Sequence, residues 1–184
     1  MTEALLLMDI QNGIVENFDA EDEYIARVVA AQEKAEDEGL LVVLVRVAFN
    51  EGHPEISRRN KTFAAMRTSG ALLLGHDSTE PHPTLVRGRG EVIVTKKRIS
   101  AFAGSDLGPI LRAHDIDHLV LAGIATSGVV LSTVREAADL DYRLTVLEDI
   151  CLDDDDDVHR VLTQKVFPRQ AEVTSTSDWQ PARA

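Results

Sequence analysis

The sequence predicts a single α/β domain: a three-layer sandwich with a mostly parallel sheet of about six strands and helices on both faces, as in Rossmann-like folds. Three observations support this fold class. The length of 184 residues fits one domain, which we expect to span residues 1–184. Several aliphatic runs are nearly continuous, and they alternate with segments of helical periodicity.

Five runs of Leu, Val and Ile predict buried strands, because strands that are covered on both faces lack the alternation of half-exposed ones. These runs are residues 4–10, 40–48, 91–96, 118–124 and 142–150. A shorter segment at residues 171–176 is expected to close one edge of the sheet.

Helical segments are predicted between the strands, which implies parallel pairing through right-handed crossovers. They are residues 22–38, 105–114, 127–140 and 158–167. Residues 50–90 depart from the alternation and contain three of the six histidines. We expect a helix at residues 57–68 and loop elsewhere in this stretch, and long loops in compact domains are often functional.

Composition narrows the class of partner. The formal net charge is −12, which argues against nucleic acid or an anionic membrane as a partner. The one cysteine, Cys151, excludes an intramolecular disulfide and any site that needs several cysteines. We expect no signal peptide, because the N-terminal apolar stretch is short and is preceded by an acidic residue, and no run of about 20 apolar residues is present. We therefore expect a cytoplasmic protein that acts on a small-molecule substrate.

The carboxyl ends of the predicted strands bring an acid and a base together, because parallel sheets bind ligands at that edge. Asp9 ends a run of Leu and Met, and Lys96 or Lys97 ends the third strand. Burial would raise the pKa of Asp9 unless a lysine offsets it, and such a pair can perform general acid–base chemistry. A buried ion pair or a helix N-cap would explain the same residues.

Three motifs give a family resemblance. MDIQNGIV, KKRISAF and GIATSGVVLSTVREAADLDYRLTVLEDIC occur in that order, and together they resemble the isochorismatase-like hydrolase superfamily of nicotinamidases, N-carbamoyl amidohydrolases and isochorismatases. The resemblance runs from the first strand through the last helix. It implies that Asp9 is the general acid/base, and its K-x-x-x-S-A-F pattern selects Lys96 as the electrostatic partner. It also implies a homo-oligomer, a dimer or larger.

The same resemblance assigns an oxyanion-binding turn after the fourth strand. It implies a cis peptide bond between Ile124 and Ala125, and backbone N–H groups that bind an oxyanion. The residues of this turn are Ile124, Ala125, Thr126 and Gly128.

The departure from the family pattern is at the nucleophile. Amidases of the superfamily carry G-V-x-T-x-x-C-V, and alignment on Gly123 and Thr126 places Val129 at the cysteine. A valine side chain has no electron pair to donate, so a covalent thioester route is closed there. We expect Cys151, which follows the next strand, to be a small buried apolar side chain. No histidine obviously activates Ser127.

Isochorismatases of this superfamily work without the cysteine, because an aspartic acid protonates a vinyl ether and water captures the resulting cation. We therefore expect hydrolysis of a small polar molecule, such as a carboxylate-bearing vinyl ether, by Asp9 acid catalysis. Two alternatives stay open: an amidase that uses another nucleophile or water, and a catalytically inactive binding or assembly protein.

Side chains after the strand ends are predicted to bind the substrate. They are Gln11, Phe49, Asn50 and Phe102. Nearby carboxylate and imidazole groups that suit zinc are Glu51, His53, His76 and His82. The Asp-x-His spacing of the nicotinamidases is absent, so we expect no metal and no other cofactor.

Overall fold

Six parallel strands form one sheet in the computed structural model, which describes residues 2–18 and 22–181. In sheet order they are β3 (Val92–Lys96), β2 (Leu41–Val47), β1 (Glu3–Met8), β4 (His118–Ile124), β5 (Arg143–Leu152) and β6 (Glu172–Thr174). All six coincide with the predicted strands to within two residues at each end. The predicted fold class is confirmed.

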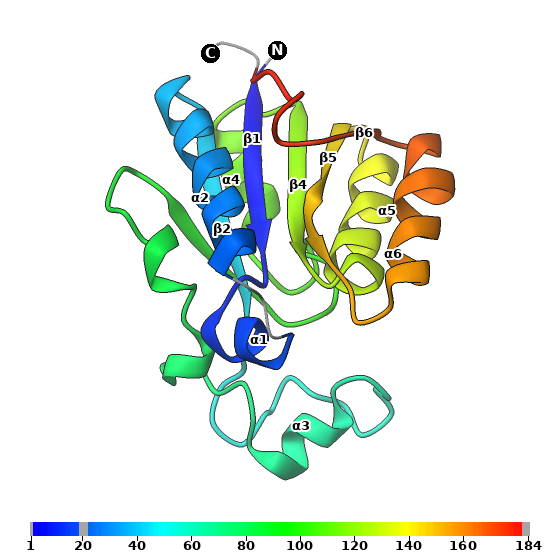
Figure 1. The fold of residues 1–184 in the computed structure, drawn as a ribbon. Helices are drawn as coiled ribbons and strands as arrows, with labels where there is room; N and C mark the ends of the chain where they lie inside the picture. Colours follow the sequence, from blue (N-terminus) through cyan, green and yellow to red (C-terminus); the bar gives the residue numbers. More distant parts are fainter. Residues whose placement is uncertain (1, 19–21, 182–184) are drawn as a thin grey trace.

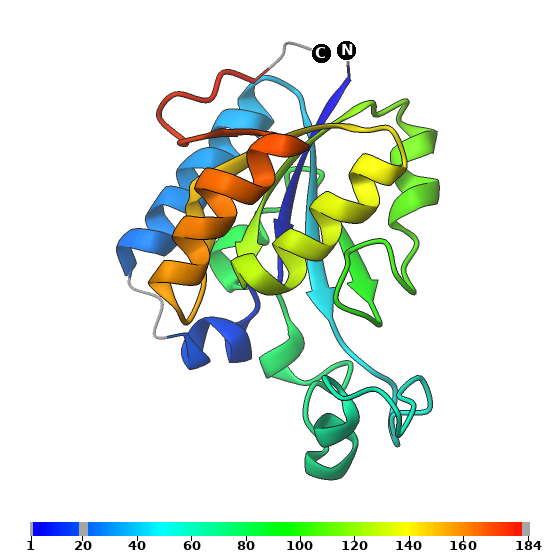
Figure 2. The same cartoon turned by 90° about the vertical axis from the view of Figure 1, so that its right-hand side faces the viewer.

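Helices cover both faces of the sheet. Figure 2 shows α2 (Asp22–Asp37) and α6 (Asp156–Val161) on one side, with α4 (Leu107–Ala113) and α5 (Leu131–Asp139) on the other. The chain of α6 continues through a wider turn at Leu162–Val166. Within residues 2–18 and 22–181, no helix combines the length and apolar composition needed to cross a membrane.

The central strand β1 explains why the aliphatic runs are continuous. It pairs with β2 on one side and β4 on the other, and all six of its residues are buried. The strand ends at Met8, two residues earlier than predicted, because Asp9 adopts a left-handed backbone conformation with φ of 58°. Asp9, the first predicted site residue, therefore stands just beyond the end of β1.

Residues 48–82, the larger part of the segment between β2 and β3, form a cap beyond the carboxyl ends of the strands (Figure 1). The cap contains α3 (Ala64–Ser69) and a short turn at Asp77–Thr79. Residues 83–91 return along α2 to the start of β3 and include a second short turn at Pro83–Leu85. The predicted helix at 57–68 is wrong over its first half. There the Ser57 and Asn60 side chains accept hydrogen bonds from nearby backbone N–H groups, which competes with helix formation.

A short helix that the sequence patterns did not predict, α1 (Asn12–Asn17), follows β1 directly. It lies between the strand ends and the cap (Figure 1). Gly13 allows the close approach, since a Cβ at this position would stand 2.9 Å from the Cβ of Ser78 in the cap. The start of the predicted helix 127–140 is also irregular, because residues Thr126–Val130 form a wide turn before α5.

Candidate active site

Asp9 and Lys96 meet at the carboxyl ends of β1 and β3, across the intervening strand β2. Lys96 Nζ lies 2.8 Å from Asp9 Oδ2, and both residues are buried. The same ammonium donates to the carbonyl oxygens of Arg98 at 3.0 Å and Ile99 at 2.9 Å. Its three hydrogens therefore all have acceptors, which fixes the charge in place.

The two oxygens of Asp9 have different surroundings. Oδ2 accepts from Lys96, whereas Oδ1 is buried and has no hydrogen-bond partner among the residues that the structure describes. Burial raises the pKa of Asp9 above its usual value, and the charge and hydrogen bond of Lys96 only partly oppose this effect. A carboxyl group with a raised pKa and one free oxygen is suited to proton transfer.

The turn after β4 closes tightly against β1. Gly123 has a φ of +149°, and a Cβ there would stand 2.1 Å from the carbonyl oxygen of Met8, so only glycine fits. The next peptide bond, between Ile124 and Ala125, is cis, as the sequence resemblance implies. This close contact places the turn beside Asp9.

Three N–H groups of this turn are occupied by acceptors within the protein. Those of Gly128 and Val130 donate to the carbonyl oxygen of Ala125 at 3.1 Å and 3.3 Å, and that of Ser127 donates to Asp153 Oδ2 at 2.6 Å. Of the residues predicted to bind an oxyanion, Gly128 therefore has no free N–H group. An oxyanion role stays a prediction for the other three, Ile124, Ala125 and Thr126.

Thr126 connects the turn to the segment that follows β5. Its buried hydroxyl lies 3.1 Å from the carbonyl oxygen of Leu152, to which it donates, and 2.9 Å from Nδ1 of His159 in α6. Sequence reasoning missed His159 and Asp153 as supports of the turn, and no local motif indicates these contacts. The hydroxyl of Thr126 is engaged and does not line the cavity described below.

No nucleophile stands in the family position. Val129 is 2% exposed and lines the cavity beside Ala125. Cys151 is buried in β5, paired in register with Gly123. Burial raises the pKa of the Cys151 thiol to about 12, so the thiol stays protonated at neutral pH. This agrees with the expectation that Cys151 is a buried apolar side chain.

A cavity of about 530 Å³ opens between the strand ends, α1 and the cap. Asp9, Lys96, Ile124, Ala125, Gly128 and Val129, all predicted site residues, line it. Its apolar wall includes Ile14, Phe18, Val47, Phe63, Met66 and Leu72. Its remaining polar side chains come from Asn17, Thr62, His76 and Ser78.

The four residues predicted to bind substrate lie outside the cavity wall: Gln11, Phe49, Asn50 and Phe102. The amide group of Gln11 is buried and bonds both backbone groups of Val47, so it holds α1 against β2. Phe49 packs against Phe63 with ring centroids 5.4 Å apart. Asn50 bonds Glu55, and Phe102 packs beside Tyr142 on the main core. Each of the four therefore has a structural contact elsewhere.

The residues weighed as metal ligands are dispersed. Glu51 is exposed, His53 is bonded to the carbonyl oxygen of Ala71 at 2.7 Å, and His82 is bonded to the Thr84 hydroxyl. Of these candidates, only His76 lines the cavity. In the part of the chain that the structure describes, no three His, Cys, Asp or Glu side chains are grouped to hold a metal ion.

Comparison with known proteins places these features in a family. The isochorismatase domain model matches residues 3–178. An uncharacterized isochorismatase family protein of Bacillus subtilis, YwoC, is 30% identical over 176 residues, which cover 96% of this chain and 91% of the relative. The ureidoacrylate amidohydrolase RutB of Variovorax paradoxus is 32% identical over 177 residues, 79% of this chain and 67% of the relative.

Solved structures show the same fold. An isochorismatase family protein from Burkholderia thailandensis superimposes with a TM-score of 0.84 at 26% identity, covering 96% of this chain and 93% of that one. N-carbamoylsarcosine amidase from Thermoplasma acidophilum superimposes with a TM-score of 0.81 at 25% identity, covering 98% and 100%.

Proposed function

The chain belongs to the isochorismatase family, and on that premise we propose that it hydrolyses a small molecule by proton transfer from Asp9, without a covalent intermediate. One observation carries the proposal. Asp9 Oδ1 has no partner among the described residues beside a cavity whose wall presents Val129 at the place of the cysteine. The acid is present, whereas the nucleophile is missing.

The proposed reaction is hydrolysis of a vinyl ether. Protonated Asp9 transfers its proton to the terminal carbon of the C=C–O unit, which leaves an oxocarbenium ion and an aspartate. Water adds to the cationic carbon and returns one proton to Asp9. The resulting hemiketal or hemiacetal then breaks its C–O bond to give a carbonyl compound and an alcohol. Lys96 stabilises the carboxylate that exists between the two proton transfers.

Amide hydrolysis is the second candidate, and it is favoured by the names of two similar proteins, an amidohydrolase and an amidase. Here ionised Asp9 would take a proton from water, and the hydroxide would attack the amide carbonyl. Both reactions need Asp9, but they need it in opposite protonation states. Activity would therefore fall with rising pH for the vinyl ether and with falling pH for the amide.

The test measures product release from three compounds, wild type against Asp9→Asn. Phenyl vinyl ether releases acetaldehyde, isochorismate releases pyruvate and benzamide releases ammonia. We expect turnover of a vinyl ether, slower in D₂O, and a loss of about 100-fold or more in the variant. Release of ammonia alone would favour the amidase. Turnover that survives Asp9→Asn, or no turnover of any compound, would contradict the proposal. Cys151→Ala is the matched control and keeps full activity.

A further inference from the structure

We infer that the cavity selects a neutral substrate with an apolar body and rejects carboxylates, an inference that rests on the proposed function for the position of the reacting bond. It differs from the sequence-based expectation of a carboxylate-bearing substrate.

The cavity wall has no uncommitted cation among the described residues. Lys96 is the one lysine or arginine that lines it, and its ammonium is fully used by Asp9 and by two carbonyl oxygens. His76, which also lines the cavity, is exposed. A carboxylate that enters would meet the Asp9 carboxyl group and no guanidinium to bind it.

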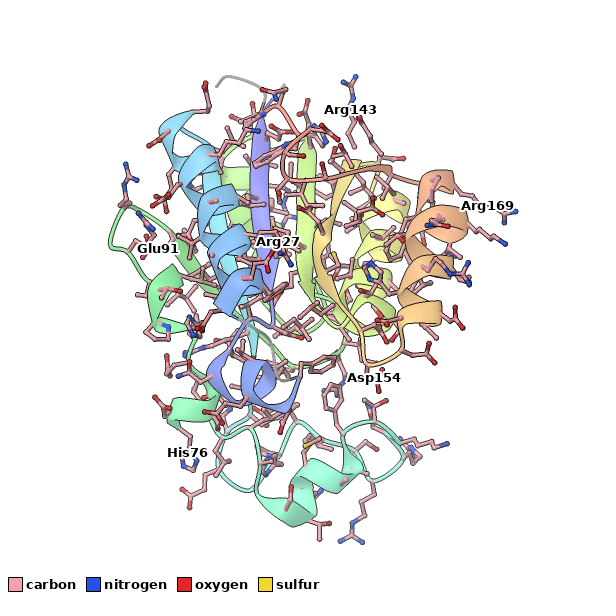
Figure 3. The ribbon with its side chains drawn as sticks, viewed as in Figure 1. Arg27, His76, Glu91, Arg143, Asp154 and Arg169 are labelled. Carbon is pink, nitrogen blue, oxygen red and sulfur yellow. The ribbon has the colours of Figure 1, made fainter. Side chains whose placement is uncertain are left out.

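The neighbouring cations are turned away from the cavity. Arg98 donates to the carbonyl oxygen of Glu55 at 2.8 Å, and Lys97 donates to that of Ala48 at 2.6 Å. Arg46 forms an ion pair with Glu80. In Figure 3 His76 lies at the cap end of the molecule, whereas Arg143, the first residue of β5, lies at the opposite end of the sheet.

A buried anion would therefore lose its hydration with no free lysine or arginine side chain in the described cavity wall to compensate. When Asp9 is ionised, the Asp9–Lys96 pair contributes no net charge, and the chain as a whole carries −12. Its long-range field opposes the approach of anions rather than attracting them. A neutral molecule avoids both of these costs.

The shape of the cavity indicates what kind of neutral molecule fits. Its volume of about 530 Å³ is within the ordinary range for small-molecule sites. Phe63, Met66 and Leu72 of the cap face the same space as Asp9 at the strand ends. The apolar body would pack against the cap, with its hydrolysable polar group directed to Asp9.

Binding of benzamide and benzoate tests the inference by isothermal titration at neutral pH. The two probes share ring and shape and differ in charge. We expect benzamide to bind with a dissociation constant about tenfold or more below that of benzoate. Chromatography of the samples confirms that benzamide stays intact during the titration. Equal affinity, preference for benzoate, or no binding of benzamide would overturn the inference.

A charge placed in the wall provides a matched pair of variants. Met66→Lys adds a cation to the cavity, whereas Thr68→Lys adds one to the same helix at an exposed position outside the wall. The first should reverse or abolish the preference for benzamide, and the second should leave it unchanged. Equal responses would contradict the inference. The binding experiment does not depend on turnover. If the Asp9→Asn variant contradicts the proposed function, the relative affinity for benzamide and benzoate still tests the inference.

Discussion

Lys96 Nζ lies 2.8 Å from Asp9 Oδ2, while Asp9 Oδ1 has no hydrogen-bond partner within residues 2–18 and 22–181. Oδ2 therefore holds the carboxyl group in place, and Oδ1 is the oxygen that remains available for proton transfer. Backbone carbonyl oxygens complete the coordination of the ammonium, so the lysine keeps its position whether or not the aspartate is charged. This arrangement explains how an acid without a neighbouring nucleophile remains oriented.

The first prediction is that Lys96→Met destabilises the protein by about 3–5 kcal/mol, because it leaves a buried carboxylate and two carbonyl oxygens without their donor. In the Asp9→Asn background the same change should cost less, since the charge is already gone. Urea denaturation of the four proteins gives the coupling free energy between the two sites. A coupling of zero would mean that the pair contributes nothing to folding.

The second prediction concerns pH. Because the pKa of Asp9 is raised by folding, the folded protein binds more protons than the unfolded chain above the unfolded pKa of about 3.8. The contribution of Asp9 to stability is therefore complete below that pH and is lost as the pH rises through the folded pKa. The stability of wild type minus that of Asp9→Asn should fall over this window in urea titrations.

Asp153 is the control with the opposite sign. Although partial burial acts to raise its pKa, the hydrogen bond from the Ser127 N–H and other bonds lower it overall. Its stabilising contribution should be present above the unfolded pKa and lost as the pH falls. The difference between wild type and Asp153→Asn should thus rise with pH. If both stability differences changed with pH in the same direction, the opposite pKa shifts assigned to Asp9 and Asp153 would be contradicted.

The sequence predicts the sheet well because burial on both faces leaves an unambiguous aliphatic signal, as in β1. It also places Asp9 correctly, since a carboxyl group after such a run stands at a strand end. The choice between Lys96 and Lys97 needed the family motif. Consecutive strand residues point to opposite faces, and strand boundaries are uncertain by one residue, so the pattern leaves both lysines open.

Other parts of the site could not be predicted, because they depend on tertiary contacts. Phe49 was expected to meet the substrate, but it is buried under Phe63 within the cap, whereas Val47 lines the cavity. The path of the cap decides whether Phe49 or Val47 lines the cavity. This path could not be predicted, because the sequence of the cap has no regular periodicity. The support of Thr126 by His159 joins residues 33 apart in the chain, with no local signature.

The third prediction concerns cysteine reactivity. Burial and a pKa of about 12 keep Cys151 inert, so native wild type should resist alkylation by iodoacetamide. Val129→Cys places a thiol on the cavity wall. Iodoacetamide should modify this thiol during an incubation that leaves Cys151 unmodified. Peptide mass spectrometry identifies the modified residue, and the double variant Val129→Cys/Cys151→Ala should react at the same rate. Modification of Cys151 in the native protein would contradict the prediction.

The fourth prediction is that Gly123→Ala costs about 3 kcal/mol or more of stability, or prevents folding. An added Cβ would stand 2.1 Å from the Met8 carbonyl oxygen, at a φ of +149° that side chains avoid. Gly52→Ala is the matched control, because Gly52 has a positive φ of +75° but no atom within 4 Å of the added Cβ. Strain alone should cost that variant about 1 kcal/mol.

Thermal and urea unfolding of the two alanine variants separate the effect of the clash from that of backbone strain. Equal losses in the free energy of unfolding would mean that the clash with Met8 adds nothing to the strain. Activity gives a second readout. Met8 is joined directly to Asp9, so any shift that relieves the clash at Gly123 moves the acid relative to Lys96. A folded Gly123→Ala protein should therefore lose turnover below its melting temperature. Gly52→Ala, in the cap and outside the cavity wall, should keep it.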